Sequence, residues 1–319
     1  MGNRESQKGV ALVTVLLIVS LSATVATAML VRKDIEAQRQ ASIRDWGQAY
    51  QVALGVEAWG MQILLRDLKE SGKKDTLSEE WATLLPPMSI TGGEISGKIE
   101  DLQGRFNLNN LKWEGELEKL EQDLEFQQFQ RLLESAGGDS ELAYAVVDWI
   151  DQGQALIHNF GAEDAEYMEE VPPYRAGNRF FASASELLLV KGITREIYQQ
   201  LKPYVIALPE SDTLLNVNTV SMPLLLALDP VLNDERVKMV EEQQRDGGFA
   251  SLSGFASHAA FQGSLIDKQH FLKNLGLYSK YFQVTADITV GKSRLKYAAV
   301  IVRLSDVEIY PLYRTFEGG

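Results

Sequence analysis

The sequence predicts an α+β fold in which a long N-terminal helix packs on an antiparallel sheet that carries a large all-α insertion. Three observations predict this class. Apolar residues recur at three- and four-residue spacing over 32–70, the block 116–208 reads mostly as helix, and 281–317 alternates apolar and polar side chains. Because strand-like segments lie on both sides of the helical block, we expect one sheet with a helical insertion.

The composition is that of a folded body and excludes some classes of function. Of the 319 residues, 45% are hydrophobic and 24% are charged, which is ordinary for globular domains. The net charge of −13 disfavours nucleic-acid binding, because phosphate recognition needs a basic face. The chain has no cysteine, so disulfides and cysteine-based metal or redox sites are excluded.

Turns and breaks divide the chain after the long helix. The chain loosens at 70–75, and Pro86-Pro87 is expected to break any regular element. Strand-like segments follow at 93–102 and 105–111. In the second of them, Phe106 and Leu108 are predicted on one face, with Asn107 and Asn109 on the other.

Further on, Gly137-Gly138 is expected to end one helix, and Ser140 to cap the next. Turns at 291–293 and 305–306 predict an antiparallel meander of three strands at the C-terminus. We find no internal repeat in the sequence.

The N-terminal region from Gly9 to Val31 carries no charge, and Arg32 and Lys33 end the run. A helix of this length spans ~30 Å of hydrocarbon. From the residues alone, three interpretations stay open. The run is an uncleaved membrane anchor, or it is a secretory signal that is cut after the A-x-A at 26–28. A third interpretation, N-myristoylation at Gly2, rests on the motif at Met1-Gly2 and would add a lipid beside a helix that already spans the membrane.

The details of this region favour a fourth interpretation. The short charged leader ends in Gly9, and apolar residues begin at once with Val10. The stretch QKGVALVTVLLIV resembles a prepilin-type signal. That resemblance implies a cut after Gly9 by a prepilin peptidase, methylation of Val10, and retention of the helix.

Thr14 departs from the common pilin pattern, in which the fifth residue after the cut is Glu. A charge inside a bilayer costs several kcal/mol, on the order of 3, unless it is paired. The family's carboxylate pairs with the N-terminal amine of the neighbouring subunit, and a subunit without it need not sit in the repeating shaft. Among pseudopilins this departure is a feature of the K-type minor subunit.

A long acidic loop follows the predicted helix that ends near residue 150. Several carboxylates in one glycine-bearing loop can surround a hard cation, although a solvated loop is the commoner meaning of such a composition. The pattern is not that of an EF-hand. The acidic residues are Asp148, Asp151, Glu163, Asp164, Glu166, Glu169 and Glu170.

A series of blocks between Gly104 and Thr219 resembles, in the family's order, the K-type minor pseudopilins of type II secretion systems. The resemblance implies an α/β pseudopilin body with an inserted helical domain that binds calcium. Asp151, Glu163 and Asp164 are then the leading ligands, with Asp148 supporting, although Gln152 and Gln154 stand where relatives carry further acids. The blocks are GRFNLN, DWID, GAED, PPYRAGNR, SELLLV and LNVNT.

The resemblance also implies a domain organisation and a role. The role is that of a minor pseudopilin at the tip of the pseudopilus, which starts its assembly and supports export of folded periplasmic proteins across the outer membrane. The implied partners are the I-type and J-type minor pseudopilins, the prepilin peptidase and the inner membrane, with the body in the periplasm. We expect a leader (1–9), a transmembrane helix (10–31), the first part of the α/β domain (32–114), an inserted helical domain (115–212), a helix-hairpin-helix-like segment (213–275) and C-terminal strands (276–319).

The sequence gives little support to two other functions. Residues 215–255 resemble a helix-hairpin-helix, which makes a membrane-anchored DNA-binding protein the alternative. The turn at 229–234 lacks glycine and contains Pro230 and two aspartates, so we expect no nucleic-acid partner. The three histidines, His158, His258 and His270, are scattered without a nucleophile pattern, and we expect no enzyme activity.

Overall fold

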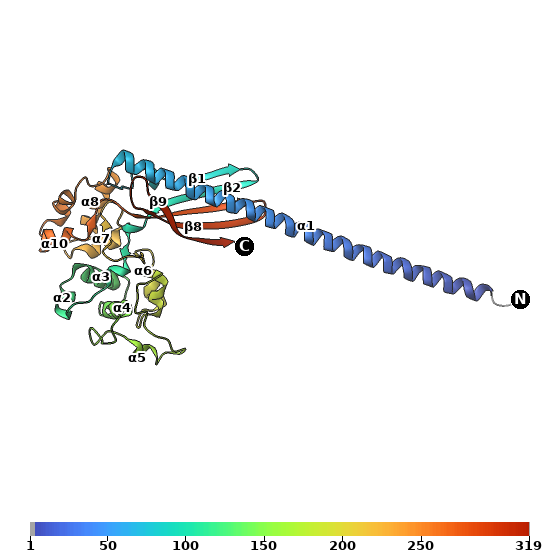
Figure 1. Cartoon of the computed structure of the whole chain (residues 1–319), viewed down its shortest axis with the longest axis horizontal. Coiled ribbons are helices and arrows are strands. Elements are labelled where there is room, and N and C mark those ends of the chain that lie inside the picture. The colour runs from blue at the N-terminus through green and yellow to red at the C-terminus, as the bar shows by residue number, and fades with distance from the viewer. Residues whose placement is uncertain (1–3, 319) are drawn as a thin grey trace.

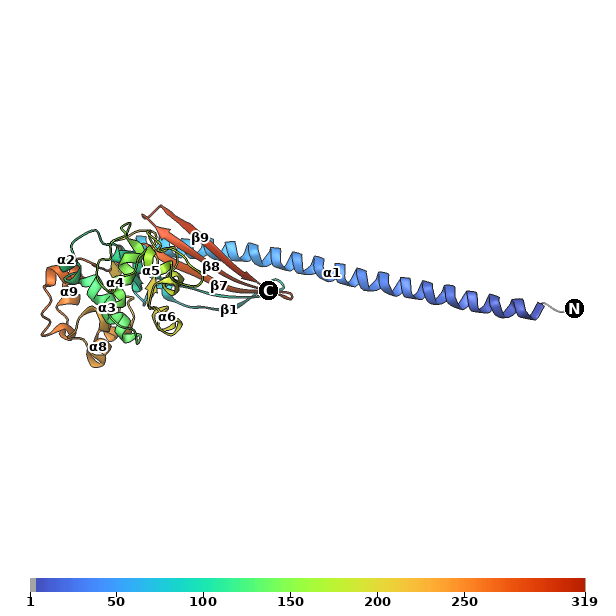
Figure 2. The ribbon, with the colours of Figure 1, turned by 90° about the horizontal axis from the view of Figure 1, so that it is seen from below.

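The computed structural model describes residues 4–318 and shows a body carried on one long helix (Figure 1). Helix α1 runs without a break over Arg4–Ser71. Its outer half projects alone, whereas its inner half lies along a sheet (Figures 1 and 2). The expected continuation of the apolar helix into an amphipathic one is therefore confirmed.

One antiparallel sheet of five strands, in the order β1-β2-β7-β8-β9, covers the inner half of α1. Ala49, Ala53 and Leu64 of α1 share a core with the inward-facing residues of β7 and β8. The predicted C-terminal meander is confirmed, with Gly291 at a positive φ in the first turn. The strands are β1 (Leu85–Ile90), β2 (Gly93–Asp101), β7 (Tyr281–Val290), β8 (Ser293–Arg303) and β9 (Ile309–Gly318).

Pro86 and Pro87 do not break the chain as expected, because they lie within β1. This strand is at the edge of the sheet, and its register shifts between Leu85 and Met88. An edge strand tolerates proline, since one side of its backbone needs no ladder hydrogen bonds.

The helical part, residues 106–276, lies between β2 and β7 in the chain and next to one end of the sheet (Figure 1). The α-helices are α2 (Leu117–Glu121), α3 (Leu124–Ser135), α4 (Leu142–Ile150), α5 (Asp164–Tyr167), α6 (Arg195–Leu201), α7 (Met222–Leu228), α8 (Asp234–Arg245), α9 (Leu252–Ala256) and α10 (Lys268–Leu272). Short 3₁₀-helices are η1 (Glu80–Ala82), η2 (Leu102–Gly104), η3 (Leu108–Leu111), η4 (Ala184–Leu189) and η5 (Ala259–Phe261).

Two local expectations for this part were wrong. The segment 105–111 is not a strand with a polar face: β3 covers only Phe106–Asn107, and η3 follows at once. Asn107 and Asn109 are both buried. Ser140 does not cap α4, whose first residue follows Glu141. The expected stop at Gly137-Gly138 is confirmed, since α3 ends at Ser135 and Gly137 has a positive φ.

The helical part contains an internal repeat that the sequence did not reveal. Each unit begins with a two-residue strand and an Asn-x-Asn turn, at 107–109 and at 216–218. In each turn the first asparagine side chain accepts from the backbone N–H two residues on, at 3.2 and 3.0 Å. Each unit ends with a strand, β4 (Val205–Ile206) or β6 (Leu275–Gly276), that pairs in parallel with the first strand, β3 or β5 (Leu215–Asn216).

The second asparagine of each turn fixes a distant phenylalanine of its own unit. Asn109 accepts from the backbone N of Phe181 and donates to its carbonyl, and Asn218 does the same with Phe249. Each phenylalanine opens the sequence F-A-S-x-S, at 181–185 and 249–253. The asparagine–phenylalanine separation is 72 residues in the first unit and 31 in the second. The acidic loop lies within the longer unit.

The buried apolar residues form three clusters, one within the helical part, one within the α/β part and one between the two. One fills the helical part, and a second lies between α1 and the sheet. A third, small cluster lies between them and consists of Leu102, Leu208, Tyr281, Val300 and Val302, with Ile206 against it.

Candidate functional site

The acidic cluster, defined as Asp148, Asp151 and Glu163, is built at the end of a buried helix. Every residue of α4 after Leu142 is buried, so Asp148 is held inside the last turn. Asp151 is the C-cap of α4, and Glu163 precedes α5 as its N-cap. Asp148 and Asp151 are close in the sequence, whereas Glu163 reaches them only because the loop between the two helices folds back.

Each member of the acidic cluster offers one carboxylate oxygen within 4.8 Å of those of the other two. Asp148 is fully buried and Glu163 is 2% exposed. One oxygen of Asp148 accepts from the backbone N of Ile157 at 3.2 Å. Its Oδ2 and both carboxylate oxygens of Glu163 are buried without a hydrogen-bond partner. Buried polar atoms are rarely left without partners, so these oxygens are available to a bound group.

Gly161 is a residue of this site that the sequence did not indicate. A Cβ at this position would lie 1.9 Å from Asp148 Oδ2. Only glycine therefore lets the loop pass over the carboxylate. Gly153 also lies close to the cluster: its backbone N donates to Asp151 Oδ1 at 2.6 Å, and a Cβ there would lie 3.1 Å from the same oxygen.

Burial and mutual repulsion act on the ionisation of the acidic cluster. Burial raises the pKa of Asp148 to about 7, and the nearby Asp151 adds to the effect. Burial raises the pKa of Glu163 to about 8, with Asp148 and Asp151 contributing. Carboxylates held this close repel one another unless a proton or a cation neutralises part of their charge.

Asp164 lies beside the cluster but is engaged elsewhere. Its Oδ1 accepts from the backbone N of Ala176 at 3.0 Å, and its Oδ2 lies 3.7 Å from Arg175 Nη1. The structure thus brings together three of the four expected ligands and directs the fourth carboxylate toward the loop at 175–176.

The acidic cluster fits a hard cation. Oxygen ligands from carboxylates and backbone carbonyls suit calcium, whose site tolerates irregular geometry. The unpartnered oxygens of Asp148 and Glu163 are the donor atoms that such an ion requires.

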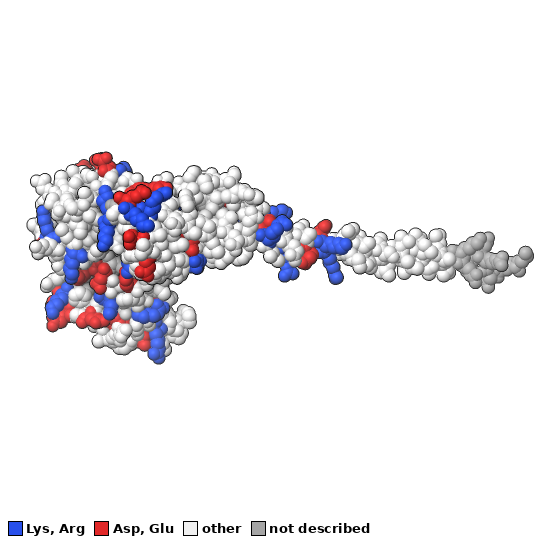
Figure 3. Space-filling view, turned by 45° about the horizontal axis from the view of Figure 1, so that its top comes forward, with Lys and Arg blue, Asp and Glu red and all other residues white. Residues whose placement is uncertain are grey.

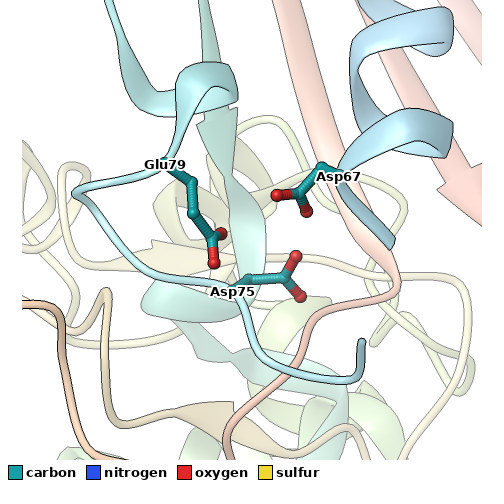
Figure 4. A group of neighbouring side chains, drawn as sticks. All are labelled: Asp67, Asp75 and Glu79. Atoms are coloured by element: carbon teal, nitrogen blue, oxygen red, sulfur yellow. The ribbon is translucent and has the colours of Figure 1, made fainter. Parts of the chain in front are cut away.

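A second acidic group, Asp67, Asp75 and Glu79, has a different environment. Figure 4 shows the three side chains near one another, from α1 and the segment after it. The buried Arg303 donates from Nη2 to both oxygens of Asp75 at 2.6 Å, and its Nη1 lies 3.4 Å from Asp67 Oδ2. Glu79 accepts from Trp81 Nε1 and from the backbone N of Thr76. A guanidinium already supplies the positive charge here, so we assign no metal to this group.

The N-terminal residues lie in α1. Gly9 belongs to the helix, and residues 1–3 of the expected leader lie outside the described residues. Thr14 Oγ1 donates to the carbonyls of Val10 and Ala11, at 3.0 and 2.9 Å, so its hydroxyl is satisfied within its own helix. Figure 3 shows a stretch free of charged side chains before the first charges of the stalk. By length and composition, this helix can span a membrane once.

The hairpin between α7 and α8 is closed by its own side chains. Asp229 is buried, and its Oδ1 accepts from the backbone N of Val231 at 2.9 Å. Its other oxygen accepts a hydrogen bond from Ser264. A carboxylate therefore occupies the backbone N–H group that a phosphate-binding hairpin would present.

Comparison with known proteins identifies the family. Two family models, both described as type II secretion system protein K, match residues 104–210 and 215–274. A protein K from Pseudomonas aeruginosa is 35% identical over 99% of this chain and 95% of its own length. The chain belongs to the type II secretion system protein K family. The protein K of Aeromonas hydrophila is 31% identical over 98% of each chain.

A solved member of the protein K family has the same fold. The structure of the GspK-GspI-GspJ complex from enterotoxigenic Escherichia coli aligns with a TM-score of 0.76 and 26% identity, over 88% of this chain and 99% of that chain. The family is a component of a secretion apparatus, and the structural neighbour supports a minor pseudopilin. The DNA-binding alternative has no support among these relatives.

Proposed function

We propose that this chain is the K-type minor pseudopilin at the tip of a type II secretion pseudopilus, where it starts assembly and supports export of folded periplasmic proteins. The observation that carries the proposal is full-length similarity to protein K relatives together with a fold shared with the GspK of a three-subunit complex. That complex supports partners of the I-type and J-type for this chain.

The shape of the molecule fits this position. The helical part projects to one side of the sheet at the end of α1 away from the apolar segment (Figures 1 and 2). A helical part of this size would collide with neighbouring subunits in a closely packed helical shaft, whereas the end of a filament leaves space for it. The apolar segment would anchor the chain in the inner membrane, with the body in the periplasm.

We further propose that the acidic cluster holds a calcium ion. Asp148, Asp151 and Glu163 would supply the ligands, and the ion would neutralise carboxylates that otherwise repel one another. The ion would be structural, fixing the acidic loop against the end of α4. Asp164 would hold the far side of that loop through Ala176.

A secretion assay tests the proposed role. In a strain lacking its own K-type subunit, the full chain should restore exoprotein release and should co-purify from detergent-solubilised membranes with the I-type and J-type subunits. Failure of both readouts, with the chain present in the membrane at normal level, would contradict the proposal. Release without co-purification would place the chain elsewhere in the apparatus.

A further inference from the structure

The junction between the helical part and the α/β part has an unusual composition. The two large apolar cores do not merge, and the apolar cluster between them is small. Parts joined by a small apolar interface move relative to one another unless something directional fixes them. Hydrogen bonds have that directionality, because they weaken steeply when donor and acceptor turn away from each other.

A buried polar network crosses this junction and is centred on Asp101, at the end of β2. Asp101 Oδ2 accepts from Asn216 Nδ2 at 2.9 Å, from Thr219 Oγ1 at 2.6 Å and from Ser279 Oγ at 2.6 Å. Its Oδ1 accepts from the backbone N of Gln103 at 2.8 Å. Asn216 and Thr219 belong to the second helical unit, whereas Asp101 and Ser279 flank strands of the sheet.

The network continues into the ion pair at the end of α1. Asn216 Nδ2 also donates to the backbone carbonyl of Asp75 at 3.2 Å. Ser279 N donates to Asp75 Oδ2, and Arg303 binds both Asp75 oxygens from the other side. Arg303 Nη1 also donates to Asp67 of α1 at 3.4 Å. Side chains from α1, β2, β8 and the helical part thus share one continuous set of hydrogen bonds, within which Asn216 and Arg303 are fully buried.

The internal repeat explains why Asn216 stands at this place. The first asparagine of each Asn-x-Asn turn reaches out of its own unit, whereas the second fixes that unit's phenylalanine. Asn107 Nδ2 donates to the carbonyl of Glu210 at 2.8 Å and to Thr213 Oγ1 at 3.0 Å, in the segment that leads to the second unit. Asn216 makes the corresponding contacts with the α/β part. The same residue position therefore ties unit one to unit two and unit two to the sheet.

We infer that the Asp101–Asn216–Thr219 network is an orientation lock that holds the helical part at one fixed angle to α1. Buried polar groups of this kind contribute uniqueness of arrangement more than net stability, since their burial costs about as much as their pairing returns. The lock makes the helical part and the long helix one rigid body. When α1 moves, the helical part then moves with it and the angle between them does not change.

Distance measurements between two spin labels test the lock. Because the chain has no cysteine, two introduced cysteines are the only labelling sites. Labels replace the exposed Gln51 on α1 and Gln199 on α6 in the full chain, purified in detergent micelles. Pulsed electron double resonance should give one narrow distance distribution. Asn216→Ala and the nearly isosteric Thr219→Val should each broaden it, and the double variant should broaden it further.

Asn218→Ala is the matched control. Asn218 is as buried as Asn216 and two residues away, but within the described residues its side chain hydrogen-bonds only to Phe249 of its own unit. Asn218→Ala should lower the melting temperature yet leave the Gln51–Gln199 distribution narrow. A second label pair within the helical part, Gln199 and Lys238, should stay narrow in Asn216→Ala.

Two results would overturn the inference. If the Gln51–Gln199 distribution stays narrow in the folded Thr219→Val and Asn216→Ala variants, the other contacts across the junction set the angle. These are the apolar cluster and the bonds from Gln103 to the carbonyl of Leu214 and from Lys280 to Glu210. If Asn218→Ala broadens it as much as Asn216→Ala does, the effect is general loosening rather than a lock. Should Asn216→Ala fail to fold, Thr219→Val, which removes a single hydroxyl, decides the question.

Discussion

Arg314 of β9 and Glu57 of α1 form a bidentate ion pair that fastens the C-terminal strand to the long helix. Arg314 Nε and Nη2 lie 2.6 and 2.8 Å from the two oxygens of Glu57. Tyr297 of β8 donates a third hydrogen bond to the same carboxylate. Glu57 is only 4% exposed, so it is a charge buried in the helix–sheet interface and held by its partners.

The Glu57 pair should make stability depend on acid pH. Burial alone would raise the pKa of Glu57, but the hydrogen bonds from Arg314 and Tyr297 outweigh it and the pKa is lowered from its ordinary 4.5. A carboxyl group whose pKa is lowered by folding adds stability at pH values above its ordinary pKa. That stability is lost as the pH falls through the folded-state pKa. Glu57→Gln should therefore be less stable than the parent at pH 7, and the difference should shrink below pH 4.5, in thermal unfolding followed by circular dichroism.

The exposed Glu80, which pairs with Arg66 at the surface, supplies the control. Glu80→Gln should change stability by less than about 0.5 kcal/mol at either pH. A Glu57→Gln deficit that stays constant between neutral and acid pH would contradict the assignment of a linked proton to this site.

Asn109 should be among the polar residues on which stability depends most. It is fully buried, donates to the carbonyls of Phe181 and Leu208, and accepts from the N–H of Phe181. Asn109→Ala leaves these backbone groups without partners and should cost about 2–4 kcal/mol in urea unfolding. Asn159→Ala, at an exposed position of the acidic loop, should cost less. Equal losses would contradict the assigned role.

Asn109 also shows where sequence reasoning reached its limit. Alternation at 105–111 predicted a strand, because a period of two is shared by strands and by turns in which every second residue is asparagine. The asparagines instead make the backbone turn by hydrogen bonding two residues on. The pair of Asn-x-Asn sequences, each followed by F-A-S-x-S, was the signal that could have shown the repeat.

Other features followed directly from local chemistry. The apolar run and its amphipathic continuation predicted α1, and the alternation and turns of 281–317 predicted three strands. Asp148, Asp151 and Glu163 lie together as expected. The side chain of Asp164 instead binds Ala176 and Arg175, and the sequence did not show that this loop would pass beside it. The buried ion pair of Arg303 could not be predicted, because its partners Asp67 and Asp75 lie more than 200 residues away in the sequence.

Calcium should stabilise the chain through the acidic cluster. An ion that binds only the folded state adds about 2.7 kcal/mol at a concentration one hundred times its dissociation constant. The melting temperature should therefore rise with added calcium chloride and fall with a chelator. Asp148→Asn and Glu163→Gln should each abolish the calcium-dependent rise, measured by differential scanning calorimetry.

Two variants make the calcium experiment specific. Glu169→Gln removes an exposed carboxylate of the same loop and should keep the calcium-dependent rise. Asp75→Asn, in the group neutralised by Arg303, should lower stability but also keep the rise. A rise that survives Glu163→Gln and disappears in Asp75→Asn would move the ion to the second acidic group.

The N-terminus of the mature chain should be Val10. Mass spectrometry of the N-terminal peptide from membranes should show a methylated Val10, and Gly9→Val should block the cut and leave the leader in place. Gly2→Ala, which removes only the myristoylation motif, should change nothing. A first residue at Met29 would indicate a cut secretory signal, and an intact Met1 an ordinary anchor; either result contradicts the pseudopilin interpretation of this segment.

Thr14 should decide where in a filament the chain can stand. Its hydroxyl is satisfied by Val10 and Ala11 of its own helix, so it needs no neighbour, whereas a carboxylate there would be an unpaired charge in the bilayer. Thr14→Glu supplies the group that pairs with a neighbouring N-terminal amine, and immunogold labelling should then find the subunit along overproduced pseudopili rather than at one end. Thr14→Val, which keeps the shape without the hydroxyl, should label as the parent does. If Thr14→Glu still labels only the end, the bulk of the helical part, and not the missing carboxylate, keeps this subunit out of the shaft.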